Sequence, residues 1–265
     1  MFGKYLRRWN LVSDGEPIAT HSSDLLPVRF GDVPAMLKVA RSEEERRGAS
    51  LMAWWDGSGA ARVLAHDGDA ILMERATSRR SLADMAHQGH DDEASRIICN
   101  VATTLHARRG PPPRDLVPLS DWYAELSHVA GTDTGIFSQA AATAGELLAS
   151  TQEQHVLHGD LHHRNVLDFG GRGWLAIDPK GLIGDHGFDF ANILCNPDFE
   201  IATGPGRMNR QIDVVAEAAQ LDPARLLRWV FAYAALSAAW TIGEGGDPTL
   251  AFTIAHMAAA EIAAG

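Results

Sequence analysis

The sequence has few cysteines, and they form no recognisable pair. Its 265 residues contain two, Cys99 and Cys195, without CxxC spacing and each in an apolar stretch. A disulfide framework or a paired-cysteine metal motif is therefore excluded. We expect both to be buried thiols in a reducing compartment, which is typical of a cytoplasmic protein.

Long apolar runs and basic runs are also missing. No stretch approaches eighteen uninterrupted apolar residues, and residues 1–8 lack the apolar region of a signal peptide. We therefore expect a cytoplasmic protein with no membrane partner. The basic residues form nothing longer than pairs, such as Arg46-Arg47, Arg79-Arg80 and Arg108-Arg109. A nucleic-acid partner is not expected.

Basic residues are fewer than acidic residues in the sequence. Against 34 acidic residues there are 23 basic ones, and the formal net charge is −11. Such a protein attracts cations, including a cationic small molecule. Solubility alone is the other explanation of this charge.

One stretch, residues 155–194, concentrates the polar side chains that suggest chemistry. Asp160 and Asn165 lie five residues apart in a polar loop. An apolar strand, a glycine-rich turn and a second strand follow, and the second strand ends on Asp178. A loop with a hairpin behind it can direct these three side chains to one point.

This grouping suits phosphoryl transfer. The transition state of that reaction needs positioning and charge neutralisation rather than covalent chemistry from the protein. Asp160 can accept the proton of an attacking hydroxyl, while Asn165 and Asp178 provide oxygens suited to Mg²⁺. The sequence therefore predicts a catalytic base beside a metal site.

The same residues carry a family resemblance. The loop His158-Gly-Asp160-Leu-His-His-Arg-Asn165, followed by Ile177-Asp178-Pro179, resembles segments of the aminoglycoside phosphotransferases, which are relatives of protein kinases. Further phrases resemble the streptomycin 6-phosphotransferase and hydroxyurea phosphotransferase subgroup: Asp14-Gly-Glu-Pro-Ile, Pro34-Ala-Met-Leu-Lys38, Trp54-Trp-Asp-Gly, Trp174-Leu-Ala-Ile-Asp178-Pro-Lys-Gly-Leu-Ile-Gly and Leu236-Ser-Ala-Ala-Trp240. The resemblance spans nearly the whole chain. It implies an α+β, bilobal protein-kinase-like fold, with a nucleotide-binding lobe at residues 1–75 and a catalytic, substrate-binding lobe at residues 76–265.

Local patterns agree with a small antiparallel sheet and one helix in the first lobe. Residues 14–40 form short β-type runs broken by turn residues, and residues 61–66 and 70–74 form two more. Residues 42–55 are typical of a helix, with Ser42 as the cap and Glu45 three positions later. From Ser81 onward the period becomes helical, which predicts a larger, mainly α-helical second lobe. Its helices are expected at residues 82–87, 92–107, 119–130, 136–150, 213–220, 223–242 and 248–264.

Lys38 lies in the apolar run Ala35-Met-Leu-Lys-Val-Ala, and an ammonium there requires an anionic partner. The resemblance implies that Lys38 holds the α and β phosphates, oriented by a helix carboxylate. Glu45 lies on the inward stripe of the helix and is the expected partner, with Glu44 in reserve. A lysine on the solvent face of an edge strand remains the alternative.

The other expected nucleotide contacts rest on the resemblance. Ser22 and Ser23 lie where kinases carry a glycine-rich phosphate cover, although this turn has no glycine. The backbone of Glu74 to Ala76 is expected to meet the adenine edge, with Met73 lining the pocket. The implied cofactors are ATP, with GTP not excluded, and Mg²⁺.

Two further residues are expected to be structural. His158 is expected to lock the loop by hydrogen bonding, and Asp189 to accept backbone hydrogen bonds from it, as the resemblance implies. Three histidines and an aspartate in this loop also allow a zinc hydrolase. A nucleotide-binding protein without transfer is a further alternative, although Lys38, Glu45, Asp160, Asn165 and Asp178 are all present.

The resemblance implies streptomycin as the acceptor, phosphorylated at its 6-hydroxyl and causing antibiotic resistance. The guanidinium groups of streptomycin suit carboxylates and an aromatic wall. Candidate substrate residues are Asp185, Asp198, Glu200, Glu244 and Asp247, with Trp240 as the wall. Hydroxyurea or another small hydroxylated compound is the alternative acceptor, and monomer or dimer is left open.

Overall fold

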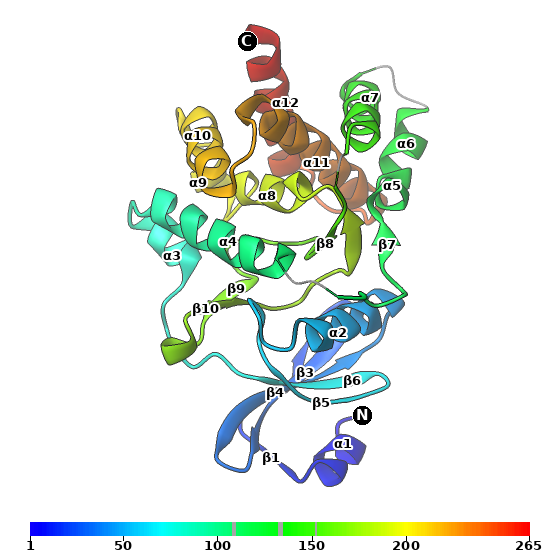
Figure 1. Ribbon diagram of the computed structural model, residues 1–265, viewed down its shortest axis with the longest axis vertical. Coiled ribbons are helices and arrows are strands. Elements are labelled where there is room, and N and C mark those ends of the chain that lie inside the picture. Colours follow the sequence, from blue (N-terminus) through cyan, green and yellow to red (C-terminus); the bar gives the residue numbers. More distant parts are fainter. Residues whose placement is uncertain (108–109, 132–134, 152) are drawn as a thin grey trace.

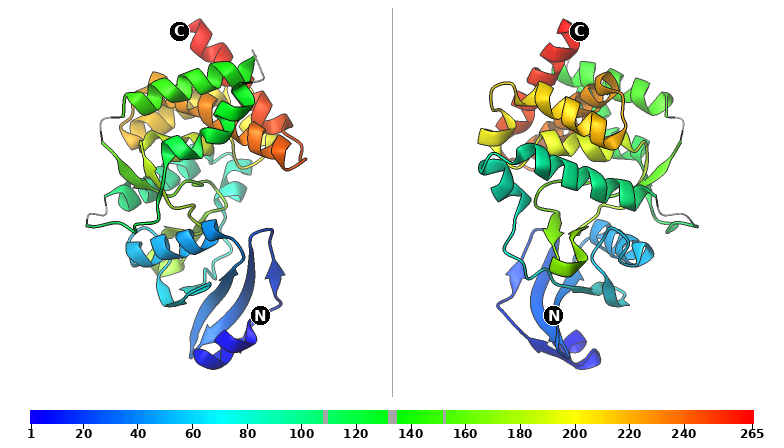
Figure 2. Two further views of the ribbon diagram at one scale, coloured as in Figure 1. Left: turned by 90° about the vertical axis from the view of Figure 1, so that its right-hand side faces the viewer. Right: turned by 60° about the vertical axis from the view of Figure 1, so that its left-hand side comes forward.

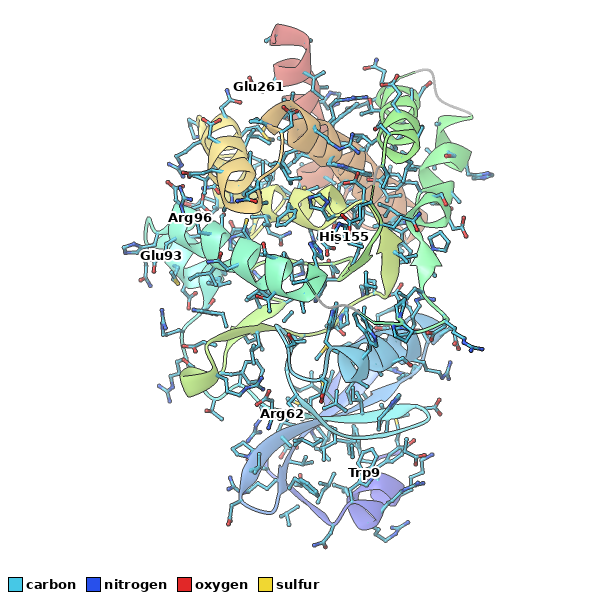
Figure 3. The ribbon with its side chains drawn as sticks, in the orientation of Figure 1. Trp9, Arg62, Glu93, Arg96, His155 and Glu261 are labelled. Carbon is cyan, nitrogen blue, oxygen red and sulfur yellow. The ribbon has the colours of Figure 1, made fainter. Side chains whose placement is uncertain are left out.

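The computed structural model describes residues 1–107, 110–131, 135–151 and 153–265, so the Arg108-Arg109 pair lies outside the described residues. Figure 1 shows a sheet with two helices at one end of the long axis and a helical region at the other. Trp9 and Glu261 mark these opposite ends in Figure 3.

The first region is a sheet with the strand order β1-β3-β4-β6-β5, and β2 pairs with β3. All these pairings are antiparallel, as predicted. Its elements are α1 (Gly3–Arg8), β1 (Leu11–Ser13), β2 (Ile18–Ala19), β3 (Ser23–Phe30), β4 (Val33–Ala40), α2 (Glu43–Trp55), β5 (Val63–Asp67) and β6 (Ala70–Glu74).

Side chains alternate across the sheet because successive strand residues point to opposite faces. Leu37 and Val39 of β4 belong to one apolar cluster, in which Tyr5 of α1 also packs. Lys38 lies between them in sequence and therefore points to the other face. Ile71 and Met73 pack there, in a second cluster that includes α2.

Helix α2 begins and ends as its sequence predicts. The Ser42 side chain accepts a hydrogen bond from the Glu45 amide, and Asp56 ends the helix in the left-handed conformation. Glu45, Met52 and Trp55 are buried on one stripe. In Figure 2, α2 lies between the sheet and the helical region. Its apolar face therefore joins both regions in one continuous core.

The second region carries the central hairpin and most of the helices. Its strands are β7 (Val117–Pro118), β8 (His155–Leu157), β9 (Val166–Asp168), β10 (Trp174–Ala176) and β11 (Leu182–Gly184), with a 3₁₀ turn at Gly170–Arg172. Its helices are α3 (Leu82–His87), α4 (Asp91–His106), α5 (Leu119–Trp122), α6 (Ala124–Ala130), α7 (Ile136–Ala149), α8 (Gly187–Leu194), α9 (Phe199–Ala202), α10 (Arg207–Ala219), α11 (Pro223–Gly243) and α12 (Thr249–Ala264).

Helix α11 runs through the centre of this region. Within the described residues it is the one helix long and apolar enough to cross a membrane, and 61% of its most apolar segment is buried inside the protein. Burial of this kind is what a core helix shows. The boundary predicted between residues 75 and 76 follows the end of β6 and stays a prediction.

Two helix predictions differ from the structure. The single helix expected at residues 119–130 is interrupted at Tyr123, whose ring packs edge-on against Phe188 at 5.9 Å. Helix α10 begins at Arg207, six residues before the predicted start at Asp213. Arg207 is buried in a two-bond salt bridge to Asp91, a tertiary contact that local sequence patterns do not reveal.

Candidate active site

The polar loop after β8 is fixed by one buried carboxylate. Asp189 of α8 accepts hydrogen bonds from the backbone amides of His158 and Gly159, at 2.8 and 2.7 Å, and from His106 Nε2 at 2.8 Å. Burial alone would raise the pKa of Asp189, but these bonds and the charge of His106 outweigh burial and lower the pKa. Asp189 therefore fixes the loop by accepting hydrogen bonds from its backbone.

His158 connects this loop to the second hairpin strand and to α2. Its Nε2 donates to the carbonyl of Ile177 at 2.8 Å, and its Nδ1 accepts from the Asp160 amide at 3.2 Å. This pattern requires a neutral imidazole, and burial indeed lowers the pKa of His158. Trp55 of α2 stacks on the ring, with centroids 6.2 Å apart.

Asp160 is held by two carboxamides. Asn192 Nδ2 donates to Oδ1 at 3.0 Å, and Asn165 Nδ2 donates to Oδ2 at 3.1 Å. Burial acts to raise the pKa of Asp160, but the hydrogen bond and charge of His162 and the charge of Lys180 outweigh it, so that the pKa is lowered. At neutral pH this side chain is a carboxylate that can accept the hydrogen bond of a hydroxyl group.

Asn165 and Asp178 lie at the end of the β9–β10 hairpin. The Ile177 amide donates to the Asn165 carbonyl at 2.9 Å, which places the residue after Ile177 beside Asn165. The Asn165 NH₂ group donates to Asp160, so the side-chain oxygen of Asn165 points away from Asp160. Asp178, at φ +62°, has a partly exposed carboxylate. Two hard oxygen donors of this kind fit Mg²⁺.

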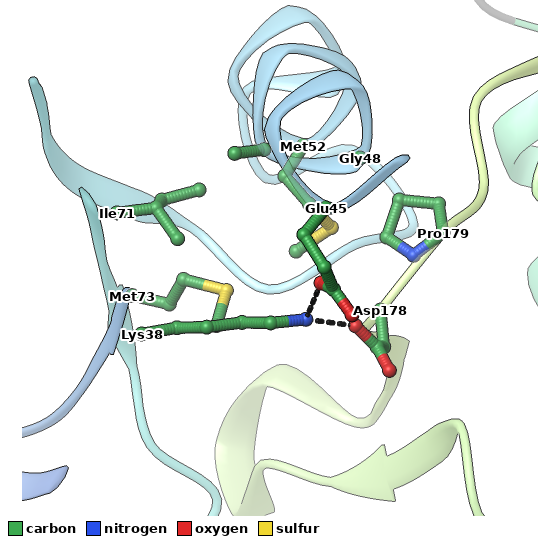
Figure 4. A pocket seen from close by; sticks show the side chains of 9 residues that line it. Lys38, Glu45, Gly48, Met52, Ile71, Met73, Asp178 and Pro179 are labelled. Atoms are coloured by element: carbon green, nitrogen blue, oxygen red, sulfur yellow. Dashed lines mark hydrogen bonds and ion pairs between the residues drawn. The ribbon is translucent and has the colours of Figure 1, made fainter. Parts of the chain in front are cut away.

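Lys38 and Glu45 complete the site from the first region (Figure 4). The Lys38 ammonium contacts the carboxylates of both Glu45 and Asp178, and the Lys38 side chain is 11% exposed. Burial would raise the pKa of Asp178, but the Lys38 charge and hydrogen bond lower it. The solvent-facing alternative for Lys38 is therefore wrong, and residues 140 positions apart meet at one point.

The remaining nucleotide candidates have different placements. Ser22 donates to Glu45 Oε1, beside the Lys38 pair, and Met73 lines the same small pocket as Lys38. Ser23 is buried and bonds Thr20, so its hydroxyl does not reach the site. The Glu74 and Arg75 amides donate to Arg62 and Pro34 within the sheet region. The Ala76 amide has no protein acceptor among the described residues.

Asp160 lines a second, larger cleft of about 510 Å³, which is separate from the small pocket around Lys38. It contains two of the predicted substrate residues, Trp240 and Glu244, which lie at the end of α11. Trp240 packs edge-on against Trp122, with ring centroids 5.3 Å apart. The cleft is lined by Glu44, Trp122, Gly159, Asp160, Lys180, Tyr233, Ser237, Trp240, Thr241 and Glu244.

The other predicted acids do not line this cleft. Asp185 is buried, pairs with Arg225 at 2.5 Å and accepts from the Gly187 amide at 2.8 Å. Asp198 caps α9 and contacts His87, while Asp247 binds the Thr249 amide. Glu200 lies in the first turn of α9. Each of the first three already has structural partners, which sequence alone could not reveal.

Sequence reasoning missed Lys180 and misplaced Glu44. The Lys180 ammonium pairs with Glu44 Oε1 at 2.9 Å, so Glu44 is not a reserve partner of Lys38. Burial would lower the pKa of Lys180, but the charge and hydrogen bond of Glu44 raise it. The sequence signal that could have pointed to Lys180 is the scarcity of lysine, because Lys4, Lys38 and Lys180 are the only lysines in the sequence.

The zinc alternative finds no support in the geometry. No group of three or more His, Cys, Asp or Glu side chains that could hold a metal ion occurs among the described residues. His158 bonds the Ile177 carbonyl, and His163 is buried 4.0 Å from Asp91. The side chains of His158 and His163 are buried and contact other protein groups instead of converging on a zinc site.

The comparison with known families identifies the chain. Residues 8–245 match the family model described as aminoglycoside/hydroxyurea antibiotic resistance kinase. The chain belongs to this family. The predicted family and the predicted enzyme class, a phosphotransferase, are therefore confirmed for this kinase.

Curated relatives of this kinase cover most of its length. It is 52% identical over 245 residues to a streptomycin 3''-kinase of Klebsiella pneumoniae, across 91% of this chain and 92% of the relative. It is 32% identical to a streptomycin 6-kinase of Streptomyces griseus, across 90% and 81%. It is 29% identical to a hydroxyurea phosphotransferase of Kitasatospora aureofaciens, across 91% and 72%.

Solved structures confirm the predicted fold of this kinase. An aminoglycoside phosphotransferase in a ternary complex with ADP and hygromycin B aligns with a TM-score of 0.65 at 16% identity, over 98% of this chain and 96% of the other. A choline kinase of Cryptosporidium parvum aligns with a TM-score of 0.63 at 13% identity, over 93% and 88%. The bilobal, protein-kinase-like α+β fold is therefore shared.

Proposed function

We propose that this kinase transfers the γ-phosphoryl group of ATP to a hydroxyl of streptomycin and so causes resistance to that antibiotic. One observation carries the proposal. Asp160 lines the cleft of about 510 Å³, and its Oδ2 accepts a hydrogen bond from Asn165, which lies beside Asp178 and its partner Lys38. The carboxylate thus lies between a chamber for an acceptor and a cluster suited to metal and phosphates.

The chemistry follows from these positions. Lys38 uses two of its three donors on Glu45 and Asp178, which leaves one N–H for the α and β phosphates. Asn165 and Asp178 would hold Mg²⁺, which neutralises the phosphate charge when bound. Asp160 orients the acceptor hydroxyl and takes its proton as the new phosphorus–oxygen bond forms. The lowered pKa of Asp160 keeps it ionised for this task.

The cleft suits a large cationic acceptor. Glu44 and Glu244 place two carboxylates on its wall, and Trp240 with Trp122 supplies an aromatic surface. A guanidinium binds carboxylates in pairs of hydrogen bonds and stacks on aromatic rings. The volume of about 510 Å³ lies within the range of about 300–1,000 Å³ typical of small-molecule sites. Streptomycin, with its guanidinium groups, has the matching chemistry.

For the reacting hydroxyl, we propose the 3''-position. The sequence analysis predicted the 6-hydroxyl, which the relative at 32% identity phosphorylates by name. The relative at 52% identity is a 3''-kinase by name and matches over 92% of its own length. The greater identity makes a shared acceptor pocket the simpler expectation.

Hydroxyurea is the second candidate acceptor, suggested by the relative at 29% identity. Its few heavy atoms would leave most of the cleft to water, and it has no cationic group for Glu44 and Glu244. We place the reaction in the cytoplasm, where ATP and Mg²⁺ are available, with ATP rather than GTP as the donor.

An acceptor panel tests this proposal. Purified protein is incubated with Mg²⁺ and either ATP or GTP, together with streptomycin, hygromycin B or hydroxyurea, and nucleotide consumption is followed. We expect streptomycin to give the highest kcat/KM with ATP. Phosphorus–proton correlation NMR of the product then distinguishes 3'' from 6. Turnover with hydroxyurea alone would overturn the proposal.

A further inference from the structure

We propose that Lys180 is a catalytic residue that contacts the phosphoryl group during transfer, and that Glu44 holds its ammonium before the acceptor enters. This inference rests on the proposed function, because it assigns a role in the same reaction. Lys180 lies two residues after Asp178 and lines the cleft beside Asp160.

The backbone of Lys180 is fixed on both sides. Its amide donates to the His158 carbonyl at 2.7 Å, and its carbonyl accepts from Arg47 Nε at 2.9 Å. Gly159, at φ +86°, permits this approach, since a β-carbon there would stand 3.0 Å from Lys180 Cβ. The backbone of Lys180 therefore lies between the catalytic loop and α2. Its side chain lines the cleft.

The reaction needs a cation at this place. In the transition state, negative charge spreads over the three equatorial oxygens of the transferring group. Lys38 is held on the nucleotide side by Glu45 and Asp178. Of the described residues that line the acceptor cleft, Lys180 is the one with a basic side chain. It is thus placed to neutralise charge on the acceptor side of the phosphorus.

The present partner of Lys180 can be exchanged. The Lys180 and Glu44 side chains are 21% and 33% exposed, so their pair is partly screened by water. A lysine has a flexible stem and three rotatable donors, unlike the planar guanidinium of arginine. The chain has twenty arginines but a lysine here. A cationic acceptor that binds Glu44 would release the ammonium toward the phosphoryl group.

The step balances without any additional reactant. The bond between the γ-phosphorus and the β,γ-bridging oxygen breaks, and its electron pair leaves with ADP. The acceptor oxygen forms the new bond to phosphorus, and its proton passes to Asp160. Lys180 stays protonated throughout and contributes only charge and hydrogen bonds.

A purely structural role makes a different prediction. If Lys180 only anchors α2 through Glu44, then breaking the pair from either side should have the same effect. Lys180→Met and Glu44→Gln remove opposite partners and therefore separate the two roles. Lys4→Met, in α1 at the far end of the sheet, is the matched lysine control.

We expect Lys180→Met to lower kcat by about 10²-fold, the scale of losing one transition-state donor, with little change in the KM for streptomycin. Lys180→Arg should recover part of kcat. Glu44→Gln should mainly raise that KM, and Lys4→Met should behave as the parent. Equal losses of kcat in Lys180→Met and Glu44→Gln would overturn the proposal.

A binding measurement separates this inference from the identity of the acceptor. Calorimetry with Mg²⁺, ADP and aluminium fluoride, which imitates the transferring group, needs no acceptor. Lys180→Met should weaken this complex by about 10²-fold while binding Mg²⁺ and ADP nearly as the parent does. If the parent does not phosphorylate streptomycin, the proposed function fails, but this comparison still decides the role of Lys180. Equal weakening of both complexes, or of neither, contradicts it, and Lys180→Gln serves if the methionine variant does not fold.

Discussion

The carbonyl of Pro179 lies against Gly48 of α2, so that a β-carbon at residue 48 would stand closer than 3.0 Å to the carbonyl oxygen. This approach connects the helix that carries Glu44 and Glu45 to the segment that carries Asp178 and Lys180. The two lysine pairs that cross between the regions, Lys38 with Asp178 and Lys180 with Glu44, lie beside it.

Gly48→Ala should therefore impair activity although alanine favours helices. Displacement of α2 would pull Glu45 from Lys38, and a shift of about 1 Å can cost about 10²-fold in rate. Gly145→Ala is the matched control, because Gly145 is an exposed position of α7 with open space around it. That variant should gain about 0.5–1 kcal/mol of stability and keep full activity. Steady-state kinetics and urea unfolding measure both, and equal behaviour of the two variants would refute the close-packing argument.

Asp160→Ala should lower kcat by about 10²–10⁴-fold, the usual scale for loss of a general base. Binding of Mg²⁺ and ADP should change little, because Asp160 faces the acceptor cleft. Turnover and calorimetry check the two effects separately. Asp213→Ala, on the exposed side of α10, is the control. A variant that keeps near-normal turnover would remove Asp160 from its role.

Asp178→Asn should reduce the dependence of nucleotide binding on Mg²⁺. Asparagine tolerates the left-handed conformation seen at φ +62°, so the backbone should persist while one negative charge is lost. Calorimetry of ATP with and without Mg²⁺ should show a large gain from the metal in the parent and a small one in the variant. The same gain in both proteins would show that Asp178 does not hold the metal.

The stability of the protein should fall as the pH drops below about 6.5, the pKa of a histidine in the unfolded chain. Burial lowers the pKa of His163 to about 3, so His163 stays neutral in the folded protein while the unfolded chain takes up a proton. Each such histidine costs up to about 1.4 kcal/mol per pH unit. The free energy of unfolding in urea at pH 7, 6 and 5 should fall less steeply in His163→Asn than in the parent. Exposed His128→Asn should leave the slope unchanged, and an unaltered slope in both would contradict this account.

Local sequence signals predicted the parts of the site that local structure determines. The Ser42 cap and the inward stripe of α2 placed Glu45, and the hairpin after Asn165 placed Asp178 beside it. The family resemblance supplied the pairing of Lys38 with Glu45, which residue spacing alone left open.

The sequence did not predict which residues pair with partners far away in the chain. Asp185 looked like a free acid but pairs with Arg225, forty residues away, and Lys180 lies against Glu44 from the other region. Trp240 and Glu244 line the same cleft as Asp160, because both lie at the end of α11, and their contact with a substrate stays a prediction. Such contacts depend on how α2 and the helices pack, and no local pattern encodes that.

The most direct test is transfer of label from ATP carrying radioactive phosphorus in the γ-position. Parent protein, Asp160→Ala and Asp213→Ala are each incubated with Mg²⁺, labelled ATP and streptomycin, and the antibiotic is separated and counted. We expect labelled streptomycin with the parent and with Asp213→Ala, and a loss of about 10²–10⁴-fold with Asp160→Ala. Unlabelled streptomycin with the parent protein, or undiminished labelling with Asp160→Ala, would contradict the account.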